Sequence, residues 1–130
     1  MFRLVKVLHG NNQYEAQRLP FGASVNIAPG CALSCQGGTL AVPTATAMPD
    51  YIAISSSNRS TNKKIDAMLV TEDMVFKVEI TGTVTPTLGM SVGLSTKEYK
   101  MDAVTYNANG KGTVIGIDSA TGLVYVKFRK

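Results

Sequence analysis

The chain has 130 residues, of which 45% are hydrophobic and 17% are charged, and its formal net charge is +4. This length indicates one compact domain that buries roughly two-thirds of the surface of its unfolded chain. The composition excludes a disordered chain, and no run of residues approaches the roughly 20 apolar positions of a membrane-spanning helix. The first residues mix charges with apolar side chains and lack a cleavage site of small residues, so the sequence predicts synthesis in the cytoplasm without a signal peptide.

Thr, Val and Gly are frequent, and Trp is absent. β-Branched side chains favour a pleated sheet, and glycines favour tight turns. The sequence therefore predicts an all-β fold, either a small barrel or a sandwich. The predicted strands, in chain order, are residues 2–8, 24–27, 31–35, 39–42, 51–54, 65–70, 74–80, 90–94, 97–101, 103–106, 113–117 and 123–128.

Apolar and polar residues alternate best in the middle and at the end of the chain. Residues 65–70 and 74–80 predict two strands joined by a turn at 71–73. A helix over 61–70 is the alternative, because three apolar side chains there also fit a helical stripe. A Gly37-Gly38 corner predicts one hairpin, and the 118–122 turn predicts another.

The segment after the first strand has no such pattern. Residues 9–22 are polar and aperiodic, which is typical of a long loop or of an arm that orders against a partner. We expect residues 1–22 to form an N-terminal strand and arm, and residues 23–130 to form the β-rich domain.

The sequence offers few residues for catalysis. His9 is the only histidine, and no Gly-x-Ser-x-Gly motif accompanies it. Gly110 to Thr113 has the residue types of a phosphate loop but not their spacing, and a strand follows it instead of a helix. The Glu72-Asp73 pair falls in a predicted turn, where acidic residues bond the local backbone. We predict no catalytic residue, no cofactor and no metal site.

Cys31 and Cys35 are the two cysteines. On an extended strand they lie about 13 Å apart, too far for a disulfide, so pairing would require a turn or a bulge. Their spacing, with one distant histidine, is a poor match to a zinc site. We interpret both as buried small side chains on one face of a strand and leave their pairing open.

Basic residues gather near the two ends of the chain. If the first and last strands are neighbours, these residues form one patch, and a small barrel can bind single-stranded nucleic acid through such a patch. Ordinary surface charge on edge strands is the alternative interpretation. The patch would consist of Arg3, Lys6, Lys127 and Arg129, with Phe2 and Tyr125 as stacking side chains.

About three-quarters of the chain, from Pro29 to Phe128, resembles the small capsid decoration proteins of tailed bacteriophages, also called cement or head-stabilising proteins. The resemblance lies in the order of the segments. They are the Pro-Gly entry to a strand in APGCAL (28–33), the paired strands DAMLV (66–70) and TEDMVFKVE (71–79), the entry PTLGMSV (86–92), and the closing strand GLVYVKF (122–128). The N-terminal stretch and the two cysteines depart from the pattern.

The resemblance implies a non-enzymatic structural protein of the virion. The expected fold is a small β-barrel or β-sandwich, of the β-tulip or SH3-like kind, with an extended N-terminal arm. The expected partner is the major capsid protein on the outer surface of the phage head, bound by a homo-trimer, with no membrane and no nucleic acid. A small nucleic-acid-binding barrel of the OB or SH3-like kind is the alternative. Aromatic and Arg side chains are common anchors of interfaces, so the predicted contact residues of the arm are Phe2, Arg3, Tyr14, Arg18 and Phe21.

Overall fold

A computed structural model describes residues 1–8, 16–22, 26–57, 63–97 and 100–130. These residues contain no α-helix, and the all-β prediction is confirmed. The strands are β1 (Arg3–Val7), β2 (Ala16–Pro20), β3 (Ala32–Gln36), β4 (Thr39–Ala41), β5 (Tyr51–Ala53), β6 (Lys64–Leu69), β7 (Met74–Thr81), β8 (Ser91–Lys97), β9 (Lys100–Tyr106), β10 (Gly112–Asp118) and β11 (Leu123–Phe128).

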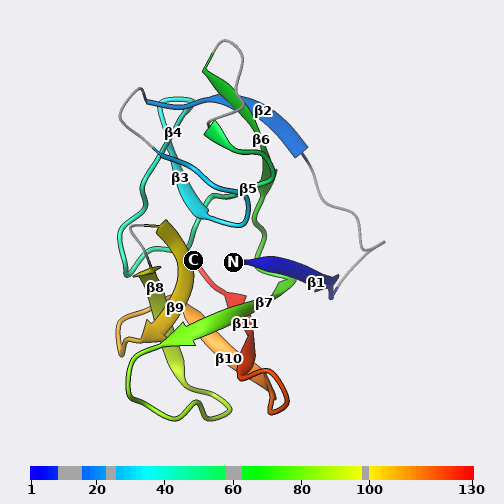
Figure 1. Cartoon of the computed structure of the whole chain (residues 1–130), viewed down its shortest axis with the longest axis vertical. Helices are drawn as coiled ribbons and strands as arrows, with labels where there is room; N and C mark the ends of the chain where they lie inside the picture. The colour runs from blue at the N-terminus through cyan, green and yellow to red at the C-terminus, as the bar shows by residue number, and fades with distance from the viewer. Residues whose placement is uncertain (9–15, 23–25, 58–62, 98–99) are drawn as a thin grey trace.

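Strands β7, β11, β10, β8 and β9 form a closed five-stranded barrel. Neighbouring strands are antiparallel, except that β7 and β9 run parallel and close the ring. β1 joins as a further strand, antiparallel to the first half of β7. The barrel occupies the lower half of Figure 1, with β1 on its upper edge. The prediction of a small barrel is confirmed.

The other strands form a curved antiparallel sheet in the order β2-β6-β5-β3-β4. Its two ends approach each other, because Phe21, directly after β2, makes an isolated bridge with Leu40 of β4. This second sheet lies above the barrel in Figure 1, so the two sheets form two stacked lobes.

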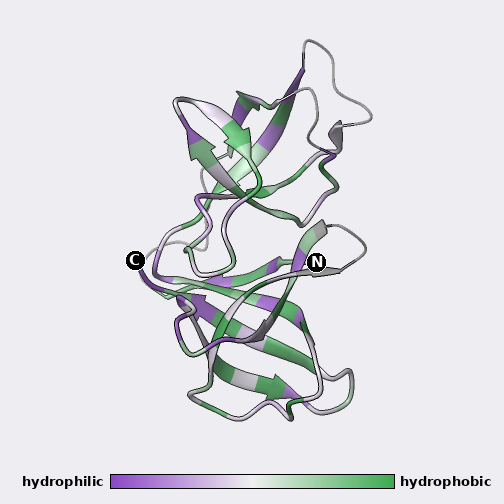
Figure 2. Cartoon of the chain, turned by 90° about the vertical axis from the view of Figure 1, so that its left-hand side faces the viewer, coloured by the Kyte–Doolittle hydropathy of each residue, from purple (hydrophilic) through white to green (hydrophobic). Residues whose placement is uncertain are grey.

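Three phenylalanines form the centre of the barrel core. Phe2, Phe76 and Phe128 lie with their ring centroids 5.8 to 6.2 Å apart. The same apolar cluster extends into the second sheet through Ala32, Ile52 and Met68, so the two lobes share a core. A smaller cluster around Leu40 fills the second sheet. Hydrophobic and hydrophilic residues alternate along the barrel strands in Figure 2, as strands with one buried face require.

The described part of the predicted N-terminal arm differs from the expectation. β1 is paired with β7, β2 is paired along its whole length with β6, and the side chain of Phe2 is 3% exposed. The backbone N–H of Phe2 also donates to the carbonyl oxygen of Gly30. Residues 1–8 and 16–22 are therefore parts of the fold, held by main-chain pairing and by burial of an aromatic ring, and not an arm outside it.

The strands around residues 65–80 are confirmed as strands, and the helical alternative over 61–70 is wrong for its described part. β6 pairs with β2 on one side and with β5 on the other. However, β6 and β7 belong to different sheets, so the turn at 71–73 carries the chain from one lobe to the other. The two predicted hairpins are confirmed as β3–β4 and β10–β11. Gly37 and Gly38 have φ of 59° and 81°, as the corner of a two-residue hairpin requires.

Candidate binding face

Basic side chains gather on the outer side of the sheet formed by β1, β7, β11 and β10. Residues directly opposite each other on neighbouring strands point to the same side. Lys77 is opposite Arg3 of β1 and opposite Tyr125 of β11. Two residues earlier in β7, Val75 is opposite Lys6 of β1 and opposite Lys127 of β11. We call this surface the basic face, and it comprises Arg3, Lys6, Val75, Lys77, Tyr125 and Lys127.

Alternation along the strands explains why these residues point outward. In β11 the side chains of Val124, Val126 and Phe128 are buried in the barrel core. Tyr125 and Lys127 stand between them and therefore face the other side. The same alternation in β7 buries Phe76 and Val78 and turns Lys77 outward.

A hollow of about 270 Å³ lies at the centre of the basic face. Val75 is in its lining, and this side chain is 1% exposed although it belongs to neither core cluster. Val5 and Ile115 also line the hollow, and they are 45% and 44% exposed. We call it the apolar hollow, and its lining consists of Val5, Lys6, Val75, Ile115, Gly116 and Tyr125.

Two β-bulges flank the apolar hollow. The β1–β7 register shifts between Leu4 and Lys6, and the β10–β11 register shifts between Val114 and Gly116. Val5 is the unpaired residue of the first bulge, and Ile115 is the unpaired residue of the second. A bulge adds one unpaired residue to a strand and redirects its side chain. The bulges explain why two large aliphatic side chains are exposed at the edges of this hollow.

One of the lysines on this face is neutralised by an ion pair. Lys77 Nζ donates to Oδ2 of Asp118 at 2.8 Å and lies 5.5 Å from the centre of the Tyr125 ring. The hydrogen bond to Asp118 raises the pKa of Lys77. In return, the hydrogen bonds from Lys77, from the Thr121 hydroxyl and from the backbone of Ala120 lower the pKa of Asp118 to about 2.

The other basic side chains of the face have no such partner. Arg3, Lys6 and Lys127 make no ion pair with any residue that the structure describes. Arg129, which we expected in the same patch, directs its Nη2 toward the carbonyl oxygen of Gly110 at 3.5 Å. The face thus presents three unpaired cationic side chains around an apolar floor.

The predicted contact residues lie in different places. Arg3 is on the basic face, whereas Phe2 is in the barrel core and so offers no surface to a partner. Arg18 lies on the second sheet, 3.4 Å from Asp66, and Phe21 packs against the core of that sheet. Tyr14 and His9 are outside the described residues.

Sequence reasoning did not identify Val5, Val75, Lys77 and Ile115 as part of a site. Lys77 could have been found, since it is an outward position of a strand with clear alternation. No sequence pattern marks Val5 and Ile115, because each stands at a bulge that interrupts the alternation of its strand.

Cys31 and Cys35 are not joined by a disulfide, and Cys31 is buried while Cys35 is half-buried. No group of three or more potential metal ligands lies together in the described part of the chain. Within the same residues, no helix has the length and apolar character needed to cross a membrane. No protein-family model and no curated protein matches the chain.

Proposed function

We propose that the chain is a structural decoration protein that binds the outer surface of a tailed-phage head and stabilises the shell. The resemblance over residues 29–128 suggests this role, and the basic face carries the proposal. That face combines unpaired cations with exposed aliphatic side chains, which is a surface suited to a protein partner.

The fold suggests how such a protein would brace a shell. The barrel is closed, and its core is continuous with that of the second sheet through Ala32, Ile52 and Met68. A body of this kind transmits load with little deformation. When it binds across the junction of neighbouring capsid subunits, separating those subunits requires breaking the added contacts as well. We propose the major capsid protein as the partner and a homo-trimer as the bound form.

The experiment uses heads of the phage that encodes this chain, prepared with the gene deleted. Purified protein is mixed with expanded heads, and bound protein is measured by co-sedimentation. We expect saturable binding with a stoichiometry set by the shell symmetry, and a higher temperature of DNA release from decorated heads. Heads that bind none of the protein, at any concentration up to that of the capsid subunit, would refute the proposal.

A nucleic-acid-binding barrel is the second candidate, because the basic face also carries an aromatic side chain, Tyr125. Two observations weigh against it. The ammonium group of Lys77 already lies against the Tyr125 ring, and Phe2, the other proposed stacking residue, is buried. Binding to single-stranded DNA and RNA, measured over a range of salt concentrations, separates the candidates, since nucleic-acid affinity falls steeply as salt rises.

A further inference from the structure

We infer that the basic face is the surface that contacts the shell, and that it takes an extended segment of the shell protein in which acidic side chains flank an apolar one. This inference rests on the proposed function and adds to it the face that binds and the chemistry of the partner.

The apolar hollow indicates which kind of side chain lies at the centre of the bound partner segment. Its floor is Val75, and its rims are the exposed side chains of Val5 and Ile115. Both rim residues stand in β-bulges, on opposite sides of the same hollow. A hollow of about 270 Å³ with such a lining suits an aliphatic or aromatic side chain of a partner, since apolar surface on both sides is then removed from water.

The charges determine what flanks that side chain. Lys6 lines the hollow itself, while Arg3 and Lys127 stand on neighbouring positions of the face, and none of the three has an acidic partner among the described residues. Acidic side chains of the partner would supply these missing ion pairs. Lys77, directly opposite Arg3, is the cation of the face whose charge is balanced, because Asp118 neutralises it.

The shape determines that the segment is extended. Two further hollows, of about 250 and 380 Å³, lie beside the second half of β7. Lys77 lines the first of them and is directly opposite Tyr125, which lines the apolar hollow. Their linings share Glu79, Thr121 and Leu123. From Val75 to Ile80 a strand rises about 17 Å, which is the length of about five residues of extended peptide. A row of hollows of this length fits an extended chain better than it fits a flat surface.

A peptide fits this face better than a nucleic acid does. Bases bind single-stranded nucleic-acid sites by stacking on exposed aromatic rings. Tyr125 is half-buried, lies over Gly116 and has Lys77 against its ring. Val5 and Ile115 offer aliphatic surface to a partner instead.

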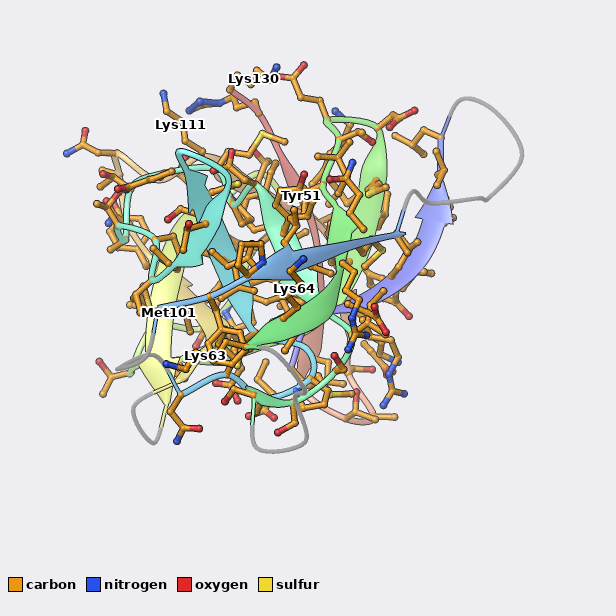
Figure 3. All side chains as sticks on the ribbon, turned by 90° about the horizontal axis from the view of Figure 1, so that it is seen from above. Tyr51, Lys63, Lys64, Met101, Lys111 and Lys130 are labelled. Atoms are coloured by element: carbon orange, nitrogen blue, oxygen red, sulfur yellow. The ribbon has the colours of Figure 1, made fainter. Side chains whose placement is uncertain are left out.

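The test compares two pairs of charge reversals in the head-binding assay. The test variant is Lys6→Glu with Lys127→Glu. The control is Lys63→Glu with Lys64→Glu, which changes the net charge equally at the start of β6 in the second sheet; both residues are labelled in Figure 3. We expect the test variant to bind heads about tenfold more weakly or worse, and the control to bind within about twofold of the wild type. A third variant, Ile115→Asp, is expected to lose binding as well.

The outcomes separate the two proposals. If the wild type does not bind heads, the proposed function fails and this inference fails with it. If the wild type binds and the test variant binds equally well, the inference alone is overturned. Circular dichroism spectra of each variant, compared with that of the wild type, check that the fold is retained.

A second measurement needs no heads. Amide chemical shifts of the labelled protein are recorded with a peptide of alternating Glu and Leu, with its Lys–Leu counterpart, and with a 20-nucleotide oligo-dT. We expect shifts around Val5, Val75 and Ile115 with the Glu–Leu peptide only. Shifts on this face with oligo-dT alone would reassign it to nucleic acid, and shifts confined to the second sheet would overturn the inference.

Discussion

Lys77 Nζ lies 2.8 Å from Oδ2 of Asp118, across the outer side of the barrel. The pair divides the basic face into two parts. Near the 118–122 turn the lysine charge is balanced by a carboxylate, and near β1 the charges of Arg3 and Lys6 are not. An acidic partner would therefore be attracted to the β1 side of the face.

The same ion pair makes part of the folding stability depend on pH. The pKa of Asp118 in the fold is about 2, below the value of about 3.9 for an unfolded Asp. The ionised form is therefore stabilised by folding, and this contribution is complete above pH 4 and is lost as the pH falls toward 2. In urea unfolding, we expect Asp118→Asn to be less stable than the wild type at pH 7, with a difference that shrinks between pH 4 and pH 2. A difference that stays constant over this range would contradict the assignment.

Phe2 is expected to behave as a core residue and not as a surface contact. Phe2→Ala removes a ring that packs on Phe76 and Phe128, so we expect a loss of about 3–5 kcal/mol in the free energy of unfolding. Val5→Ala, in the adjoining strand β1 and 45% exposed, is the control and should change stability by about 0.5 kcal/mol or less. Equal effects of the two changes in denaturant titrations would show that Phe2 is not packed as described.

Gly110 occupies a position where the chain passes very close to β8. A Cβ atom at Gly110 would lie 2.1 Å from the carbonyl oxygen of Val92, which is backbone and cannot rotate away. We expect Gly110→Ala to cost more than about 2 kcal/mol in thermal or urea unfolding. Gly122→Ala is the comparison, since its φ is +75° but the space around it is open, and we expect a cost of about 1 kcal/mol. The reverse order of the two costs would contradict the packing of the 107–112 turn against β8.

The two thiols should differ in reactivity. Cys31 is 4% exposed, Cys35 is half-buried, and no disulfide joins them. We expect a thiol reagent to modify Cys35 first in the native protein and both cysteines in denaturant. Stability should be the same with and without a reducing agent. A chain whose mass shows an internal disulfide in native conditions would contradict the structure.

The local patterns of the sequence predicted much of the fold. The Gly37-Gly38 corner and the alternation in β11 are interactions between near neighbours, and both hairpins form where these patterns indicate. The placement of β1 and β2 was not predictable in the same way. The bulge at Val5 interrupts the alternation of β1, and the strands that hold β1 and β2 come more than 40 residues later in the chain.

The basic face could be predicted only in part. Its cations were expected if the first and last strands were neighbours, and in the structure β7 lies between them and adds Lys77. The apolar hollow could not be predicted, because it depends on two register shifts in strand pairs that are far apart in sequence. Arg18 and Phe21 were grouped with Arg3 by their closeness in sequence, but the fold places them in the other lobe.

Electron cryomicroscopy of heads prepared with and without the protein tests the central claim most directly. We predict added density on the outer surface of the shell, into which the barrel and the second sheet fit as one body. The side formed by β1, β7, β11 and β10 should face the capsid subunits. Identical maps with and without the protein would contradict the account of function, and density with this side turned toward solvent would contradict the assignment of the binding face.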